Sequence, residues 1–249
     1  MNTHIKNGQS HAAADTRKAA YAVVLTAIGV ALAPYTSFPV LIAKINPTQH
    51  FVNVLGAVLL GPWWALLIAA VVGAIRNAMG VGTLLAFPGG MIGAFLAGWF
   101  YWWQKNVTHA AIGEVVGTGL LAPVASALFV APVLMGKAIP FLALMPSFLA
   151  STIVGAVLGV LGLRLLKRAD VIEFTDRSMN KTILGTTLLV VGVIILIVVY
   201  SMRPPSDFGN AFGQGRQLLY QIFLAIGGIA SLFGVIYIFL DLQAKKGTE

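Results

Sequence analysis

Long apolar runs, separated by short polar segments, dominate the 249-residue sequence. Most of these runs are 15 to 27 residues long, and as helices they are suited to a hydrocarbon core of about 30 Å. The pattern therefore predicts an all-α integral membrane protein with eight spans. The runs cover residues 19–33, 46–61, 62–80, 84–103, 110–135, 140–166, 182–202 and 218–240.

The segment that joins the second run to the third decides the topology. Asn46-Pro47 is typical of a helix start, because Asn caps a helix and Pro suits its first position. A single helix over residues 47–79 would be about 50 Å long, which exceeds the membrane core. A break at Gly61-Pro62 instead gives a hairpin of two short helices. With a cytoplasmic N-terminus, the hairpin places eleven of the 16 Lys and Arg residues inside, whereas the single helix places seven there. The positive-inside rule favours the hairpin.

Charged segments divide the chain into parts. Residues 1–18 form a polar tail that lacks a signal-peptide pattern, so we expect the first run to remain as a span. Residues 35–45 are expected to form a loop. A six-helix core over residues 19–168 is followed by a charged cytoplasmic linker, 169–181, and by a two-helix appendage, 182–249. The appendage is rich in Ile, Val, Leu and Phe and has few polar groups in its spans.

Composition supports the membrane assignment. Hydrophobic residues make up 58% of the chain and charged residues 10%, and the mean hydropathy is +0.89, whereas soluble domains average about 25% charged residues. The net charge of +8 follows from basic residues at the ends of apolar runs, which argues against a nucleic-acid partner. The absence of Cys excludes disulfides and thiolate chemistry.

Two clusters of polar side chains lie at the same membrane face if the hairpin forms. Gln49, His50 and Asn53 share one helix face by their spacing, and Arg76 and Asn77 end the next helix. A Gly-rich segment with Thr83 and Phe87 follows at once. Polar side chains at membrane depth usually face a partner or a cavity, so the arrangement favours a binding site. The alternatives are hydrogen bonds between helices for the first group, snorkelling of Arg76 into water, and tight packing of the glycines.

Glu114 is the only acidic residue within the six predicted core spans. It could pair with a cation, meet a partner helix or carry protons, but we favour an interfacial position near Lys105 or His109. The sequence contains neither a metal-ligand spacing nor a catalytic triad or carboxylate pair, so we assign no catalytic residue and no metal site. A membrane enzyme using His50 and Arg76 remains open as another class, although missing carboxylates argue against it.

Several of these segments resemble the ThiW family, the substrate-binding S components of energy-coupling factor (ECF) vitamin transporters. The resemblance covers about residues 15–168, and its motifs agree in order and spacing. The motifs are P-x-x-H-x-x-N-V at 47–54, L-L-G-P at 59–62, R-N-x-x-G-x-G-T at 76–83, A-F-P-G at 86–89 and HAAIGEVVGTG at 109–119.

The resemblance implies a function that the residues alone do not give. It implies six helices and a subunit that captures hydroxyethylthiazole, a precursor of thiamine, on the extracytoplasmic side of the cell membrane. It also implies a transmembrane coupling protein and two ATPase partners, so the chain itself needs no cofactor and is not an enzyme. Small residues on the first helix are expected to meet the coupling protein. Ala27 and Ala31 fit that pattern, whereas Val23 in the preceding turn departs from it.

The candidate substrate-binding residues are Gln49, His50, Asn53, Arg76, Asn77, Thr83 and Phe87. Both termini are expected in the cytoplasm. Two alternatives for the function remain: a proton-coupled secondary transporter in which Glu114 carries the proton, and an S component for another vitamin or vitamin precursor.

Overall fold

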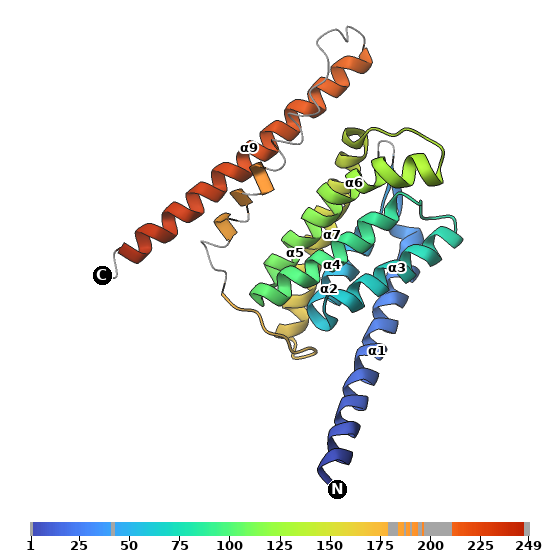
Figure 1. Ribbon diagram of the computed structural model, residues 1–249, viewed down its shortest axis with the longest axis vertical. Helices are drawn as coiled ribbons and strands as arrows, with labels where there is room; N and C mark the ends of the chain where they lie inside the picture. Colours follow the sequence, from blue (N-terminus) through green and yellow to red (C-terminus); the bar gives the residue numbers. More distant parts are fainter. Residues whose placement is uncertain are drawn as a thin grey trace. The chain divides into compact units, whose positions relative to one another are not determined.

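The computed structural model describes residues 2–40, 43–178, 184–186, 188–189, 191–193, 196 and 211–246. The chain divides into two compact units, Met1–Arg177 and Ser178–Glu249, and each is described by itself. In the first unit the helices are α1 (Asn2–Thr36), α2 (Pro47–Leu60), α3 (Pro62–Ala78), α4 (Ala86–Gln104), α5 (Val107–Val116), η1 (Gly117–Leu121), α6 (Ala122–Ala125), η2 (Ser126–Leu134) and α7 (Phe141–Arg168) (Figure 1). The strands are β1 (Phe38–Val40) and β2 (Ala43–Ile45), and the second unit contains α9 (Ala211–Lys246).

Four helical segments among the described residues are long and apolar enough to cross a membrane. They are Asp15–Thr36, Val107–Leu134, Phe141–Arg168 and Leu224–Gln243. This finding agrees with the predicted α-helical membrane protein with several spans. The arrangement of six core helices plus two appended helices stays a prediction.

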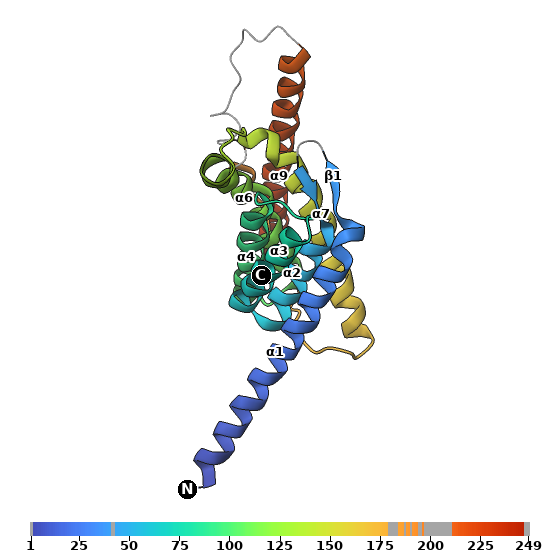
Figure 2. The ribbon, with the colours of Figure 1, turned by 90° about the vertical axis from the view of Figure 1, so that its right-hand side faces the viewer.

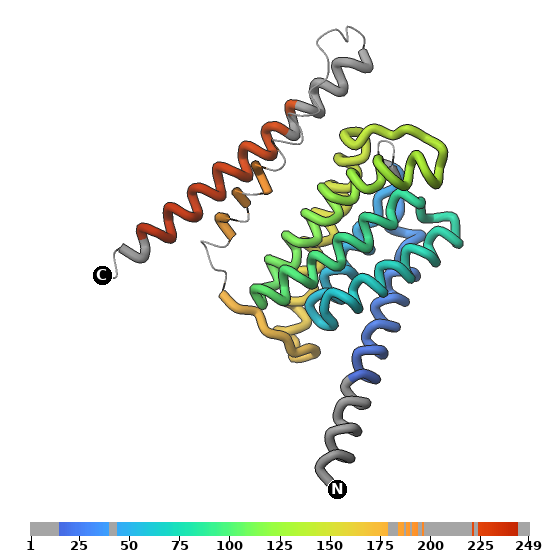
Figure 3. The backbone as a smooth tube through the Cα atoms, viewed as in Figure 1, coloured from blue at the N-terminus to red at the C-terminus, as the bar shows by residue number. Residues whose placement is uncertain are grey.

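The predicted hairpin between α2 and α3 is confirmed. The Asn46 side chain caps α2 by accepting a hydrogen bond from the backbone N–H of Gln49, and Pro47 is the first helical residue. Gly61 separates the helices with a φ of 93°, a left-handed value that favours glycine. Pro62 then begins α3. The chain reverses at this point, as Figure 3 shows, so that the start of α2 and the end of α3 lie at the same end of the unit.

The N-terminal region differs from the prediction at two places. Helix α1 begins at Asn2 and not at Ala19, and it continues through Pro34 to Thr36. Its first half includes three consecutive alanines at residues 12–14, and alanine is the strongest helix former. The expected loop over residues 35–45 contains an antiparallel pair, in which Phe38 lies opposite Ile45. This small hairpin is an exception to the predicted all-helical fold.

The predicted span over residues 110–135 is one continuous but irregular helical segment. It begins earlier, at Val107, because the Asn106 side chain accepts hydrogen bonds from the backbone N–H groups of Thr108 and His109. Two π-helical stretches, η1 and η2, interrupt the α-helix. Such stretches widen a helix locally and are common at functional sites. Here η1 carries Thr118, a residue of the site described below.

Small residues allow the helices of the first unit to approach closely. Helices α2, α3 and α4 contact one another (Figure 2). Where α4 crosses the segment of α5 and η1, a Cβ on Gly117 would lie 2.7 Å from the Cα of Gly93. Gly155 of α7 likewise lies against the Pro47 carbonyl and the His50 side chain of α2. Side chains at these glycines would push the helices apart, so the glycines fix the distance between the walls of the site.

The segment after α7 packs against the end of α4 and the start of α5. Tyr101 Oη donates to the Thr175 carbonyl at 2.7 Å, and Asn106 Nδ2 donates to the Arg177 carbonyl at 2.7 Å. The Asp176 side chain accepts a hydrogen bond from the Val107 N–H at 3.1 Å. Residues up to Arg177 therefore belong to the core, and the boundary between the units falls inside the predicted linker 169–181.

The second unit holds helical residues packed through glycines. Gly185 lies against the Gly234 carbonyl, and Gly192 lies against the Gly227 carbonyl and Ser231. Most of the predicted span 182–202 lies outside the described residues. The unit therefore has small-residue contacts that its Ile, Val and Leu content did not indicate.

Candidate functional site

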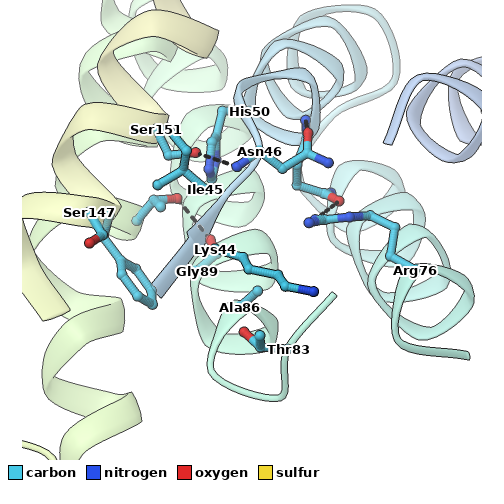
Figure 4. Close-up of a pocket in the computed structure, with 13 residues that line it drawn as sticks. Lys44, Ile45, Asn46, His50, Arg76, Thr83, Ala86, Gly89, Ser147 and Ser151 are labelled. Carbon is cyan, nitrogen blue, oxygen red and sulfur yellow. Dashed lines mark hydrogen bonds between the residues drawn. The ribbon is translucent and has the colours of Figure 1, made fainter. Parts of the chain in front are cut away.

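A polar cleft opens at the end of the first unit where α2 and α4 begin and α3 ends (Figure 4). It contains about 410 Å³ of empty space, a volume that includes the open solvent at its mouth. The cleft is lined by Lys44, Ile45, Asn46, Gln49, His50, Arg76, Thr83, Ala86, Gly89, Thr118, Ser147, Phe148 and Ser151.

The cap of α2 joins the walls of the cleft. The Asn46 backbone N–H donates to Ser151 Oγ of α7 at 3.0 Å, and Asn46 Nδ2 donates to Ser37 Oγ at 2.8 Å. Asn46 is buried and also caps α2. One residue therefore sets the start of α2 and ties it to both α7 and the segment after α1.

A chain of hydrogen bonds runs from the cleft into the core. Arg76 Nη1 donates to Gln49 Oε1 at 3.4 Å, and Gln49 Nε2 donates to Asn53 Oδ1 at 3.1 Å. Asn53 Nδ2 then lies 3.1 Å from the Gly90 carbonyl and 3.0 Å from Glu114 Oε1. The structure thus brings together three of the predicted polar residues: Gln49 and Arg76 line the cleft, while Asn53 lies beneath it.

Glu114 lies at the inner end of this chain, and the expectation of an interfacial position near Lys105 or His109 is wrong. Its side chain is fully buried, and Oε1 lies 2.7 Å from His50 Nδ1 and 3.0 Å from Thr118 Oγ1. The reason is the helix-helix contact. A Cβ on Gly93 of α4 would lie 2.7 Å from Glu114 Oε1, so the missing side chain there leaves room for the carboxylate.

Arg76 does not snorkel into water. The residue is 3% exposed, and its guanidinium makes only long contacts with neutral groups: 3.4 Å to Gln49 Oε1 and 3.4 Å to Ser37 Oγ. Its Nε is buried and has no hydrogen-bond partner among the described residues. No carboxylate of the described chain forms an ion pair with it. The cleft therefore contains a buried positive charge that the protein itself does not neutralise.

The other predicted site residues differ in position. Thr83 lines the cleft. Asn77 instead closes the turn after α3, with Nδ2 2.9 Å from the Gly73 carbonyl and 3.5 Å from the Thr83 carbonyl. Phe87 does not line the cleft and packs against Gly73 of α3. The aromatic ring that does line it belongs to Phe148 of α7.

Several residues that line the cleft were not among the predicted site residues. Ser147 and Phe148 are adjacent on α7 and lie one helical turn before Ser151, and this spacing was the available signal. Lys44 lies within the predicted loop 35–45, but it belongs to β2 at the mouth of the cleft. No group of three or more His, Cys, Asp or Glu residues able to hold a metal ion occurs in the described part of the chain.

The predicted partner face of α1 lies on its outer side. Val23, Ala27 and Ala31 follow one another at four-residue spacing, and all three are exposed. Leu25 and Gly29 face inward instead, where a Cβ on Gly29 would lie 3.1 Å from Val72 of α3. The three residues are therefore available for contact with lipid or with another protein.

Apolar helices around a polar cleft define a membrane protein that is suited to bind a small molecule. Residues 19–169 match the family model described as thiamine-precursor transporter protein (ThiW), and the chain belongs to this family. The family is one of transporters, which agrees with the prediction that the chain is not an enzyme. No curated protein and no solved structure matches the chain.

Proposed function

We propose that the chain is the substrate-capture subunit of an ATP-driven ECF importer and that it takes up hydroxyethylthiazole. The observation that carries the proposal is the cleft itself. It lies among motifs of the transporter family and combines Phe148 with hydrogen-bonding groups from β2, α2, α3, the segment after α3, η1 and α7. A flat heteroaromatic ring with a short polar arm needs this combination.

The polar residues have separate roles in this proposal. Gln49, His50, Arg76 and Thr83 contact the substrate directly, together with Ser151. Asn53 and Glu114 hold Gln49 and His50 in place from beneath, so they act as positioning residues. Asn77 shapes the turn that presents Thr83.

The orientation follows from charge. Lys105, Arg164 and Lys167 lie at the ends of α4 and α7 opposite the cleft, and basic residues favour the cytoplasmic side. The cleft therefore faces the outside of the cell membrane, and both termini lie in the cytoplasm. Two ATPases and a coupling protein supply the energy, while this chain binds no cofactor. The exposed α1 face of Val23, Ala27 and Ala31 contacts the coupling protein.

Calorimetry on the full chain tests the proposal. The ligands are thiamine, its thiazole and pyrimidine halves, and the phosphates of both halves. We expect the thiazole compounds to bind most tightly. Asn53→Ala is expected to weaken thiazole binding, because a lost hydrogen bond in the network costs about 1–3 kcal/mol. Equal binding of thiazole and pyrimidine compounds, or unchanged affinity in Asn53→Ala, contradicts the proposed site.

The buried pair of His50 and Glu114 favours one second candidate, a proton-coupled transporter. A carboxylate and an imidazole in contact can exchange a proton. Purified protein in liposomes separates the two candidates. Thiazole accumulation driven by a pH gradient, without ATPase partners, supports proton coupling; accumulation that requires the partners and ATP supports the ECF mechanism.

A further inference from the structure

The charges around the cleft are all of one sign. Among the thirteen lining residues, Lys44 and Arg76 carry formal positive charges, and none is Asp or Glu. In Figure 4 the side chains of Lys44 and Arg76 both extend from the walls toward the centre of the cleft. Glu114, the nearest carboxylate of the network, does not line the cleft, and its Oε1 is occupied by His50, Asn53 and Thr118.

The Arg76 guanidinium lacks the partners that a buried charge requires. Burying a charge is costly unless it is paired and hydrogen-bonded. Arg76 is 3% exposed, has two long contacts with neutral oxygens and keeps an unpartnered Nε among the described residues. A planar guanidinium with free N–H groups is suited to a phosphate or carboxylate, which it can bind through two oxygens.

Two helix N-termini add to the positive potential. Asn46 and Gln49 bring the first turn of α2 to the cleft, and Ala86 and Gly89 bring the first turn of α4. The N-terminus of a helix carries a partial positive charge and favours anions. The α4 N-cap residue, Leu85, forms no side-chain cap that would offset this charge.

We propose that the ligand of this cleft carries an acidic group that Arg76 and Lys44 bind, so that the phosphate monoester of hydroxyethylthiazole is taken in preference to the free alcohol. The inference rests on the proposed function for the thiazole ring, and it adds the charge of the substrate. In this arrangement the phosphate contacts Arg76 near the first turn of α4, and Lys44 closes the mouth over it. A phosphate monoester carries about −1.5 to −2 charges at neutral pH, which the two side chains balance.

Four ligands and three variants test this assignment on the full chain in nanodiscs of phosphatidylcholine. The ligands are hydroxyethylthiazole, its phosphate, the hydroxymethylpyrimidine of thiamine and its phosphate, each measured by calorimetry. We expect the thiazole phosphate to bind at least tenfold more tightly than the thiazole alcohol. Arg76→Gln should reduce this preference to less than threefold. Arg76→Lys, which keeps the positive charge, should retain part of the preference for the phosphate.

Lys44→Gln is a second test that does not disturb the core, because Lys44 is exposed. It should lower affinity for the phosphate by a larger factor than affinity for the alcohol, and so reduce the phosphate preference. Lys137→Gln is the matched control, since Lys137 is an exposed cation in the segment before α7 that does not line the cleft. This variant should keep the full preference. An equal loss in both Lys variants would indicate a general charge effect and overturn the assignment.

The ligand pairs separate this inference from the proposed function. If the alcohol binds as tightly as the phosphate, the proposal that the ligand carries an acidic group is wrong, while the thiazole site is retained. If both phosphates bind equally well whatever their ring, the anion site stands and the thiazole assignment fails. The membrane provides another source of phosphate. An unchanged preference after addition of phosphatidylglycerol supports a soluble ligand, whereas loss of the preference shows that a lipid headgroup occupies the site and overturns the assignment.

Discussion

His50 Nδ1 lies 2.7 Å from Glu114 Oε1, although 64 positions separate the two residues in the chain. Both side chains are buried, at 8% and 0% exposure. The contact joins α2, which carries the first wall of the cleft, to α5. Since Asn53 and Thr118 contact the same carboxylate oxygen, Glu114 links α2 to the continuous helical segment of α5 and η1.

Replacing Glu114 should therefore destabilise the first unit. Glu114→Ala leaves His50 and Asn53 without their buried partner, and losing one member of such a pair costs about 3–5 kcal/mol. Glu114→Gln keeps an acceptor oxygen and should cost less. Thermal unfolding in detergent measures both. Glu173→Ala, at an exposed position after α7, is the control, and an equal melting temperature for Glu114→Ala and this control would contradict the structural role.

Gly93 and Gly90 form a matched pair within α4. A Cβ on Gly93 would collide with Thr118 and come within 2.7 Å of Glu114 Oε1, whereas one on Gly90 would make ordinary contacts, the shortest 3.7 Å from Gln49 Nε2. Gly93→Ala should thus lower the melting temperature and weaken thiazole binding together. Gly90→Ala should retain both. Equal behaviour of the two variants would mean that the crossing of α4 and α5 tolerates a wider separation.

The contacts of the segment after α7 predict where the chain can be shortened without loss of binding. A protein ending at Lys181 keeps the contacts of Thr175, Asp176 and Arg177 with α4 and α5. It should fold and bind thiazole within threefold of the full chain. A protein ending at Ala169 loses these contacts and should unfold at a lower temperature. If binding falls tenfold or more in the longer of the two proteins while it remains folded, the second unit belongs to the site.

The exposed face of α1 predicts a defect in coupling that spares binding. Ala27→Trp places a bulky ring on the face of Val23 and Ala31 and should block close approach of a partner helix. Thiazole uptake and co-purification with the coupling protein should both fall, while affinity for thiazole is unchanged. Val71→Trp, at an exposed position of α3, is the control. Normal assembly and uptake with Ala27→Trp would place the partner surface elsewhere.

Local sequence signals marked the ends of α2 and the start of α3, and helix length together with the placement of Lys and Arg favoured the hairpin over one long helix. Asn46 caps, Pro47 starts α2, and Gly61 with Pro62 breaks the chain before α3. These residues act on the backbone within a few positions, so the helix ends can be predicted without knowledge of tertiary contacts. The hairpin then explains why Gln49 and Arg76 meet.

Contacts between distant helices could not be predicted in the same way. The sequence places Glu114 on a helix but does not show that Gly93 of α4 makes room for it. It placed Phe87 beside the site by proximity in sequence, although Phe148 supplies the aromatic wall. Helix rotation decides which side chain faces a cleft, and rotation is set by packing at small residues.

The most direct test of the central claim is to fill the cleft without removing a polar group. Ala86 lines the cleft at the start of α4, and Ala86→Phe adds a ring where the substrate should lie. Ala78→Phe, at an exposed position that ends α3, is the control. The ligand for calorimetry is hydroxyethylthiazole or its phosphate, whichever binds the unchanged protein more tightly. Ala86→Phe should lower the affinity for this ligand at least tenfold, about 1.4 kcal/mol, whereas the control should not. An affinity within twofold of the unchanged protein, in a variant that melts normally, would show that the substrate binds elsewhere.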